Sequence, residues 1–346
     1  MKHKTLLFFL AAAAVTALPL AAAGAPKAPP TNPVELSYAI FIPPAHPFAL
    51  QAKDWAAEVE KRTNNRVKIT LYPGGSLLKG PQVYEGIVTG VADIGFSPCS
   101  YNKAVWPGMM ALDQGIISPL NADQSTHLAN EFAKELAEKY KAKELQAMHI
   151  LYFFSTGSAL LVSNKPVYAL DELKGLQIRG AGAALAMLKA LGATPVSIPM
   201  PETTLALQKG TIDGGFISAG VLKSMKMADV VKYIVDLPLK RTAFWVGMNL
   251  DKWNTLPPDI QKIMGEVSQE WIDRVGAYTM KGETAGLDYA KQVGVEFIKW
   301  SPEEYAKAAE LIKPLLGPYI ADAEATGLPA RELVDAVVRL AEKYAK

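Results

Sequence analysis

The sequence Gly-Leu-Gln-Ile-Arg-Gly-Ala-Gly at residues 175–182 joins a short predicted strand to a predicted helix. Leu176 and Ile178 alternate with other residues as in a buried strand, and the glycines end it before the strong helix formers of residues 183–191. Arg179 is therefore expected at the carboxyl end of a strand, where open α/β sheets bind ligands and where the N-terminus of the next helix attracts anions. These residues alone leave two interpretations open: an anion-binding arginine, and a solvated arginine in a loop.

Strand-like and helix-like segments alternate along the rest of the chain. Half of its 346 residues are hydrophobic, which is enough for two domains with separate cores. Runs typical of strands occur at residues 36–42, 66–72, 92–96, 148–154, 158–163, 194–198, 211–217, 231–235 and 243–250. Because amphipathic helical segments of about 8 to 20 residues separate many of these runs, the sequence predicts the α/β class.

Two segments share the pattern Gly-x-x-Asp-x-Gly-Phe, one at residues 90–96 and one at residues 210–216. Each follows an apolar helical segment and begins a predicted strand. Coincidence is one explanation, since a glycine after a helix and before a strand is common. The matched Asp and Phe positions favour a second explanation, in which two domains of one plan each turn a strand towards a shared cleft.

Residues 257–291 contain only isolated glycines as helix breakers, so they are expected to form one very long helix or a kinked pair. An unbroken helix of this length would span about 50 Å, more than one domain. We expect it to tie two domains together. The first is predicted at residues 34–157 plus about 250–275, and the second at residues 158–249 plus about 276–346.

The first 23 residues have the features of a secretory signal peptide. Lys2 and Lys4 precede an apolar run, and small residues lead up to Ala23, the expected cleavage site. The run is shorter than the roughly 20 apolar residues that a membrane-spanning helix needs. Residues 24–33, rich in Pro and Ala, are expected to be a flexible leader.

The mature chain is expected to carry balanced charge. Removing residues 1–23 takes two lysines from the 36 basic residues and leaves 34, equal to the 34 acidic residues. A neutral protein gives no electrostatic case for binding nucleic acid or an anionic membrane, so neither is expected as a partner.

Residues with metal or catalytic chemistry are few. Cys99 is the single cysteine, so no intrachain disulfide can form, and a small buried residue is its expected role. His46, His127 and His149 are far apart in sequence and show no zinc-ligand spacing, and only His46, in a proline-rich turn after a strand, is a candidate ligand contact. No metal and no cofactor are expected.

Two enzyme-like readings are weak. Residues 180–185 imitate a dinucleotide fingerprint but lack the third glycine, and the next strand ends without an acid to hold a ribose. The chain has no Gly-x-Ser-x-Gly elbow, and a nucleophile with a base would have to come from Cys99 and His46. Binding is therefore favoured over catalysis.

Aromatic residues follow several predicted strands. Phe41, Phe96 and Phe216 each lie near the carboxyl end of a strand, where a cleft is expected. Core packing is the default explanation for such residues. Together with Arg179, however, aromatic walls are typical of a pocket for a small organic acid.

Several stretches resemble the solute-binding proteins of tripartite ATP-independent periplasmic (TRAP) transporters, and the similarity runs from about residue 35 to 340. In the order of that family the chain has His46-Pro47, Tyr72-Pro73-Gly74-Gly75-Ser76-Leu77, EGIVTGVADIG at 85–95, Lys165-Pro166-Val167, the segment from Leu173 to Arg179, ETTLALQKGTIDG at 202–214 and NLDKWNTL at 249–256. Each motif is weak alone, and the set is specific.

The resemblance implies a two-domain periplasmic binding protein fold, type II-like, with hinge strands and a long domain-spanning helix. It implies that Arg179 pairs bidentately with a substrate carboxylate, which suits the planar guanidinium. It also implies a monomer in the periplasm of a Gram-negative bacterium that passes its ligand to integral membrane permease subunits. A sensor or scavenging protein without a permease, and a periplasmic enzyme on the same fold, remain alternatives.

The chain departs from the family pattern where polar ligands are bound. By resemblance to the family, Ala159 stands at the position where sialic-acid binders and some dicarboxylate binders carry a second arginine. Phe216-Ile217 replaces a Glu-Asn pair that is frequent in the family. These departures favour a monocarboxylate with an apolar or aromatic body, held by Arg179 as the only cation of the pocket. The expected ligand-binding residues are Arg179, Phe216 and Met200 in the second domain, and Phe41, His46 and Phe96 in the first.

Overall fold

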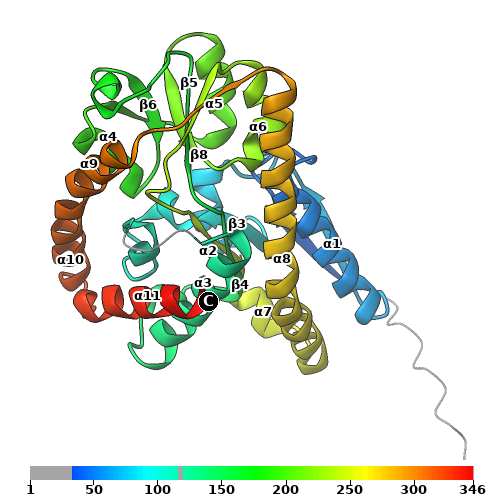
Figure 1. The fold of residues 1–346 in the computed structure, drawn as a ribbon. Helices are drawn as coiled ribbons and strands as arrows, with labels where there is room; N and C mark the ends of the chain where they lie inside the picture. Colours follow the sequence, from blue (N-terminus) through cyan, green and yellow to red (C-terminus); the bar gives the residue numbers. More distant parts are fainter. Residues whose placement is uncertain (1–32, 116–119, 346) are drawn as a thin grey trace, which may run out of the picture.

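The computed structural model describes residues 33–115 and 120–345, and in these residues two β-sheets form the centres of two α/β lobes (Figure 1). The predicted signal peptide and nearly all of the predicted leader lie outside the described residues. The α/β class is confirmed, and so is the two-lobed plan. Within the described ranges, no helix combines the length and apolar character needed to span a membrane.

The first lobe is built on a five-stranded sheet with the order β2-β1-β3-β10-β4. Strand β1 runs parallel to β2 and β3, whereas β10 runs antiparallel to both β3 and β4. Its strands are β1 (Val34–Ala39), β2 (Val67–Tyr72), β3 (Ile94–Pro98), β4 (His149–Ser155) and β10 (Ala243–Met248). Its helices are α1 (Pro47–Arg62), α2 (Val83–Val88), α3 (Ala122–Glu138) and α7 (Leu250–Thr255).

The second lobe is built on a six-stranded sheet with the order β11-β9-β5-β8-β6-β7. Strand β6 is parallel to β7 and β8, and β5 is antiparallel to β8 and β9. Its strands are β5 (Leu160–Ser163), β6 (Gln177–Gly180), β7 (Thr194–Ser197), β8 (Gly214–Ile217), β9 (Tyr233–Asp236) and β11 (Glu296–Ile298). Its helices are α4 (Ala183–Ala190), α5 (Met200–Gln208), α6 (Gly220–Ser224) and α9 (Pro302–Ile312).

Short 3₁₀ turns connect many of these elements. They are η1 (Gly80–Gln82), η2 (Cys99–Asn102), η3 (Met109–Asp113), η4 (Lys143–Leu145), η5 (Leu170–Leu173), η6 (Met227–Asp229) and η7 (Lys313–Leu315). Of these, η2 and η3 follow β3 at the edge of the first lobe that faces the second. Of the two, η2 brings Ser100 and Tyr101 to the cavity described below.

Helix α8 (Pro258–Gln292) is one unbroken helix of 35 residues, as the long-helix prediction anticipated. It packs against α1 and α3 of the first lobe and against α6 of the second, so it runs along both lobes (Figure 1). Three of its glycines lie where other segments pack closely against the helix. A Cβ on Gly276, Gly282 or Gly286 would overlap Asp123, Pro47 or Ala219, respectively. The isolated glycines of this segment therefore allow close packing without ending the helix.

The domain boundaries differ from the prediction at two places. Strand β10, placed in the second domain by the expected range 158–249, pairs with β3 and β4 in the first sheet. Helices α10 (Leu316–Glu324) and α11 (Ala330–Tyr344), placed there by the range 276–346, return towards the first lobe (Figure 1), where α11 packs against α3. Pairing between segments so distant in sequence leaves no local signal.

The Gly-x-x-Asp-x-Gly-Phe repeat occupies equivalent places in the two lobes. Asp93 precedes β3, and its Oδ2 accepts hydrogen bonds from Ser37 N at 2.7 Å and Ser37 Oγ at 2.8 Å on β1. Asp213 precedes β8, and its Oδ2 accepts from Gln177 N at 2.9 Å on β6. Each aspartate thus ties its strand to the parallel neighbour, which explains why both copies carry it.

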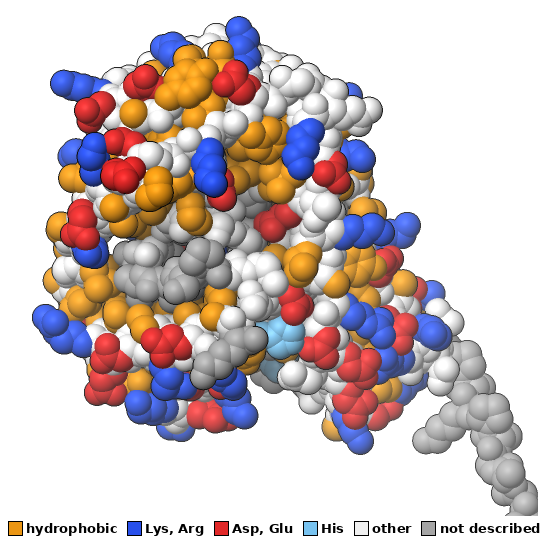
Figure 2. Space-filling model, viewed as in Figure 1, with side chains coloured by type: hydrophobic (Ala, Val, Ile, Leu, Met, Phe, Trp, Pro, Cys, Tyr) orange, Lys and Arg blue, Asp and Glu red, His pale blue; other side chains and the backbone are white. Residues whose placement is uncertain are grey.

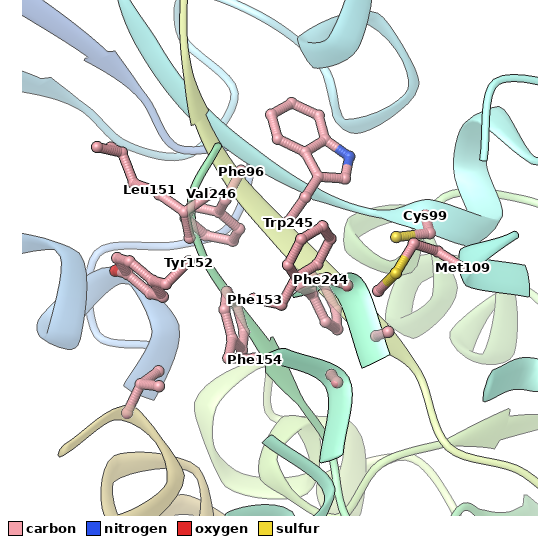
Figure 3. Packing of buried hydrophobic residues seen from close by; sticks show 14 of the residues in the cluster. Phe96, Cys99, Met109, Leu151, Tyr152, Phe153, Phe154, Phe244, Trp245 and Val246 are labelled. Atoms are coloured by element: carbon pink, nitrogen blue, oxygen red, sulfur yellow. The ribbon is translucent and has the colours of Figure 1, made fainter. Parts of the chain in front are cut away.

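An aromatic core fills the first lobe between its sheet and helices (Figure 3). Phe154 on β4 and Phe244 on β10 stack with ring centroids 4.9 Å apart, and Phe96 on β3 packs edge-on against Phe154 at 5.8 Å. Burying a ring of this size contributes about 1.5 to 3 kcal/mol. This core reaches the cavity through Phe244, so the rigid centre of the lobe also forms a wall of the site.

Two crossing segments, residues 156–159 and 237–242, join the lobes and are hydrogen bonded to each other. Thr156 N donates to Thr242 O at 3.1 Å, and Ala159 N donates to Lys240 O at 3.0 Å. We call this pair of segments the hinge. Glu283 on α8 accepts a hydrogen bond from Gly157 N at 2.9 Å, so the long helix is tied directly to the hinge.

Candidate functional site

A cavity of about 70 Å³ lies between the two lobes and is lined by both. Most of its lining is apolar. The first lobe contributes Phe41, Phe48 and Phe244, and the second contributes Met200, Phe216, Ile217, Val221 and Met225. A largely apolar cavity with a few polar side chains is the usual form of a small-molecule site.

Arg179 lies at the end of β6 and is the central polar residue of this cavity. Only 4% of it is exposed, and burial lowers the pKa of its guanidinium. Its Nε donates to Ile198 O at 3.0 Å, and Nη1 makes a long contact of 3.5 Å with Phe216 O. Among the described residues no carboxylate lies within 4.0 Å of it. Arg179 is thus a buried cation that has kept hydrogen-bond donors free and lacks a counter-ion.

The helix after Arg179 does not supply the expected anion site. Gly182 caps α4 with φ 59°, and the carboxylate of Asp113 from the first lobe accepts a hydrogen bond from Ala183 N. The positive end of α4 is therefore already neutralised by the protein's own carboxylate. The prediction that this helix end binds the ligand is wrong, because the Asp113 carboxylate already accepts from its first N–H group. The sequence did not reveal this contact because Asp113 is far from α4 in the chain.

Arg179 is also not the only cation of the cavity, which corrects a second prediction. Lys240 in the hinge lines it and is only 6% exposed. Its Nζ lies 2.9 Å from Asp113 Oδ2 in a buried ion pair. Since Lys240 already has a carboxylate partner, Arg179 remains the cavity's one cation without such a partner among the residues that the structure describes.

From the first lobe, Phe41 and His46 line the cavity as expected. His46 is 1% exposed and forms the N-cap of α1, with Nδ1 accepting a hydrogen bond from Phe48 N at 3.1 Å. Burial lowers the pKa of its ring to about 3, so the ring is neutral near pH 7.

Phe96 does not line the cavity, although the sequence placed it there. Its ring is fully buried with its centroid 5.5 Å from that of Phe41 and 6.3 Å from that of Tyr38. Phe96 therefore lies one layer below Phe41 and supports the wall. Phe96 lies within β3 and Phe41 follows the neighbouring strand β1, and sequence alone does not separate a wall residue from the one behind it.

From the second lobe, Met200, Phe216 and Ile217 all line the cavity, and Ala159 lines it where the resemblance would place a second arginine. Phe216 and Ile217 end β8, beside Arg179 on β6. Met200 begins α5, just after the Ile198 carbonyl that holds Arg179. The backbone of the second lobe thus positions the guanidinium against an apolar wall.

Tyr101 is the main residue that the sequence did not identify as part of the site. It belongs to η2 of the first lobe, lines the cavity and accepts a hydrogen bond from Met200 N of the second lobe at 2.8 Å. Burial raises the pKa of its hydroxyl, and Arg179 acts in the opposite direction. Its position just after β3 was a usable signal, because polar residues that follow strand ends face the cleft in such folds.

The other histidines and the cysteine lie elsewhere. His127 Nε2 is 2.9 Å from Asp273 Oδ1, and His149 stacks on Trp253 with ring centroids 3.5 Å apart. Cys99 is buried, which raises its thiol pKa, and it does not line the cavity. In residues 33–115 and 120–345 no group of three or more His, Cys, Asp or Glu is arranged to hold a metal ion.

Two α/β lobes, a hydrogen-bonded hinge and a buried cleft with an unpaired arginine define a two-lobed ligand-binding protein. Residues 38–322 match the family model described as bacterial extracellular solute-binding protein, family 7. The chain belongs to this family. The family is made up of transport proteins that bind solutes, and its members serve TRAP transporters.

Individual solute-binding proteins of this family are similar to the chain over most of its length. A TRAP periplasmic solute-binding protein of Desulfovibrio salexigens, solved as an open complex, superposes with a TM-score of 0.78 at 31% identity and covers 90% of this chain and 96% of its own. A TRAP solute-binding protein of Rhodoferax ferrireducens superposes with a TM-score of 0.84 at 24% identity, covering 90% and 98%. The periplasmic protein DctP of Rhodobacter capsulatus is 25% identical over 290 residues, which are 82% of this chain and 86% of that protein.

Proposed function

We propose that this TRAP solute-binding protein captures a small organic monocarboxylate with an apolar or aromatic body. The observation that carries the proposal is Arg179, a buried guanidinium without a carboxylate partner at the edge of an apolar cavity. A ligand carboxylate would supply the missing anion through the free N–H groups of the guanidinium. The apolar walls would then bury the rest of the ligand.

One carboxylate is favoured over two because, among the described residues, the cavity lining offers one cation that has no carboxylate partner. Lys240 is committed to Asp113, and Ala159 adds no charge. A second ligand carboxylate would have to be buried without a partner, which is costly. This distinguishes the site from one built for a dicarboxylate.

The ligands of relatives support an organic acid as the ligand. Because they include both mono- and dicarboxylates, the number of free cations in the cavity has to distinguish between these two classes. The Rhodoferax ferrireducens protein was solved with copurified benzoate, and one from Bordetella bronchiseptica with (R)- and (S)-mandelate. The Rhodobacter capsulatus relative is named for C4-dicarboxylates. The benzoate and mandelate proteins were thus solved with one-carboxylate ligands on the fold that this chain shares.

The proposal includes capture in the periplasm and delivery to integral membrane permease subunits, by a protein that works as a monomer. Relatives such as DctP of Rhodobacter capsulatus are named periplasmic, and residues 1–23 have signal-peptide features. Ligand contacts from both lobes would favour the closed form. A sensor or scavenger without a permease uses the same pocket, and neighbouring genes for two membrane subunits distinguish transport from those roles.

A thermal-shift panel tests the ligand class. Purified protein without residues 1–23 is screened against matched mono- and dicarboxylates. A ligand at 100 times its Kd adds about 2.7 kcal/mol to stability. We expect stabilisation by aromatic or branched monocarboxylates such as benzoate. Larger stabilisation by succinate than by every monocarboxylate would contradict the proposal, and conversion of a stabilising acid to product would favour the enzyme alternative.

A further inference from the structure

His46 is held in one orientation by the start of α1. It occupies the N-cap position with φ −71° and ψ 140°, and its Nδ1 accepts a hydrogen bond from Phe48 N at 3.1 Å. A neutral imidazole has one nitrogen that accepts and one that donates. Because Nδ1 accepts, the proton of the neutral ring is on Nε2.

That Nε2–H group has no partner in the described part of the chain. The ring is 1% exposed and lines the cavity, while its other edge is occupied by the helix cap. Buried donors in folded proteins are almost always paired. Nε2 is not one of the fully enclosed polar atoms without a partner, so it opens onto the cavity, where water pairs with it when no ligand is bound and a ligand acceptor would replace that water.

The charges around the cavity limit what that acceptor is. In the part of the chain that the structure describes, the charged groups of its lining are Arg179 and Lys240, and the Lys240 ammonium is paired with Asp113. His46 itself is neutral. A second carboxylate next to His46 would be buried without a cation, whereas a hydroxyl or carbonyl oxygen would accept the hydrogen bond at no such cost.

We infer that the ligand carries a neutral oxygen acceptor on its body, and that His46 binds this oxygen through Nε2–H while Arg179 binds the carboxylate. The inference rests on the proposed function and narrows it to oxygen-substituted monocarboxylates. His46 belongs to the first lobe and Arg179 to the second. A ligand with both groups thus contacts both lobes, which ties recognition of the oxygen to closure.

Matched benzoates test this inference by calorimetry. The probes are benzoate, 3- and 4-methylbenzoate, and 3- and 4-hydroxybenzoate, because a methyl group fills nearly the volume of a hydroxyl without accepting a hydrogen bond. A site built to bind an oxygen rejects the analogue that lacks it. We expect one hydroxy acid to bind at least tenfold more tightly than its methyl counterpart.

Two variants assign the difference to His46. The variant His46→Asn keeps a side-chain acceptor for the N-cap of α1. The variant His46→Phe keeps an aromatic ring of similar volume but has no N–H group. We expect both His46→Asn and His46→Phe to reduce the hydroxyl-to-methyl preference to within twofold. Because the ratio is taken within one variant, a general loss of stability cancels from it.

The outcomes separate this inference from the proposed function. Equal affinity for the hydroxy and methyl acids, with benzoate still bound, would overturn the role of His46 and leave carboxylate capture standing. A preference that persists in both variants would also overturn it. If isophthalate bound more tightly than the hydroxybenzoates, and its affinity fell about tenfold for each unit by which pH rises, His46 would be acting as a cation and the inference would be overturned. No binding by any of these acids, benzoate included, would overturn both.

Discussion

Tyr101 of the first lobe and Met200 of the second are hydrogen bonded across the cavity, with Tyr101 Oη accepting from Met200 N at 2.8 Å. The same hydroxyl interacts with the Arg179 guanidinium. A first-lobe side chain therefore reaches across the cavity to the backbone of the second lobe and to Arg179. On the face shown in Figure 2, acidic and basic side chains are interspersed. The contact inside the cavity is therefore a clearer guide to the binding site than the charge on this face.

Replacing Tyr101 with Phe should weaken binding because it removes the acceptor for Met200 N and the hydroxyl next to Arg179. We expect Kd to rise about tenfold, equal to about 1.4 kcal/mol, mainly through faster dissociation. Stopped-flow dissociation of a bound acid measures this. Tyr72→Phe, an exposed tyrosine of the same lobe, is the control. Unchanged dissociation in Tyr101→Phe would argue against the cross-lobe contact.

At Gly182 the two lobes approach each other closely. A Cβ there would lie 2.5 Å from Ser100 Cβ and 2.9 Å from Asp113 Oδ2, both in the first lobe. Gly182→Ala should therefore hold the lobes apart and weaken binding at least tenfold. Small-angle scattering should show no compaction on adding ligand.

A matched control separates this clash from backbone strain. Gly175 also has a positive φ, of 78°, but nothing lies within 4 Å of the position that its Cβ would take. Gly175→Ala should lower stability by about 1 to 3 kcal/mol without changing closure. If both variants compact normally on binding ligand, the tight contact at Gly182 has no role in closure.

The buried pair of Asp113 and Lys240 should be sensitive to loss of one partner. Asp113→Asn leaves the Lys240 ammonium buried without a carboxylate, and we expect a loss of about 3 to 5 kcal/mol in the free energy of unfolding. Urea denaturation measures this. The double variant Asp113→Leu with Lys240→Met should recover at least half of the loss. A single variant as stable as the wild type would show that the pair is not formed.

Glu283 should make stability depend on pH. Burial raises the pKa of its carboxyl from 4.5 to about 7, against the opposing hydrogen bond from Gly157 N. A carboxyl with a raised pKa binds its proton more tightly in the folded state. Its contribution is therefore fully present below about pH 4.5 and is lost as pH rises to about 7.

Glu283→Gln keeps an oxygen for Gly157 N and removes the titration. We expect the fall in stability between pH 4.5 and 7 to shrink by up to about 3 kcal/mol relative to the wild type. His46, whose pKa is lowered by burial, titrates in the opposite sense and cancels from the comparison between the two proteins. Parallel stability curves for both proteins would contradict a protonated Glu283.

Local patterns were enough to predict the elements around the site. Arg179 lies at the end of a buried strand followed by a helix, as glycine placement and helix propensity indicated. The long helix and the repeated aspartates were also visible, because each depends on residues close together in the chain.

The features that were missed all depend on contacts between distant segments. Asp113 fills the start of α4, Tyr101 reaches Met200, and β10 inserts between β3 and β4. No periodicity or turn signal records such pairings, since they form only when the lobes assemble. Phe96 was misplaced for the same reason, as its neighbours come from three different strands.

The most direct test of the account is titration calorimetry of Arg179→Ala with the acid that stabilises the wild type most. The account predicts a loss of at least about 3 kcal/mol in binding free energy, more than a hundredfold in Kd, because the ligand carboxylate loses its buried partner. Arg66→Ala, which removes a surface arginine paired with Asp259, should bind like the wild type. An Arg179→Ala protein that remains folded and binds within about threefold of wild type, a change under 1 kcal/mol, would contradict the central claim.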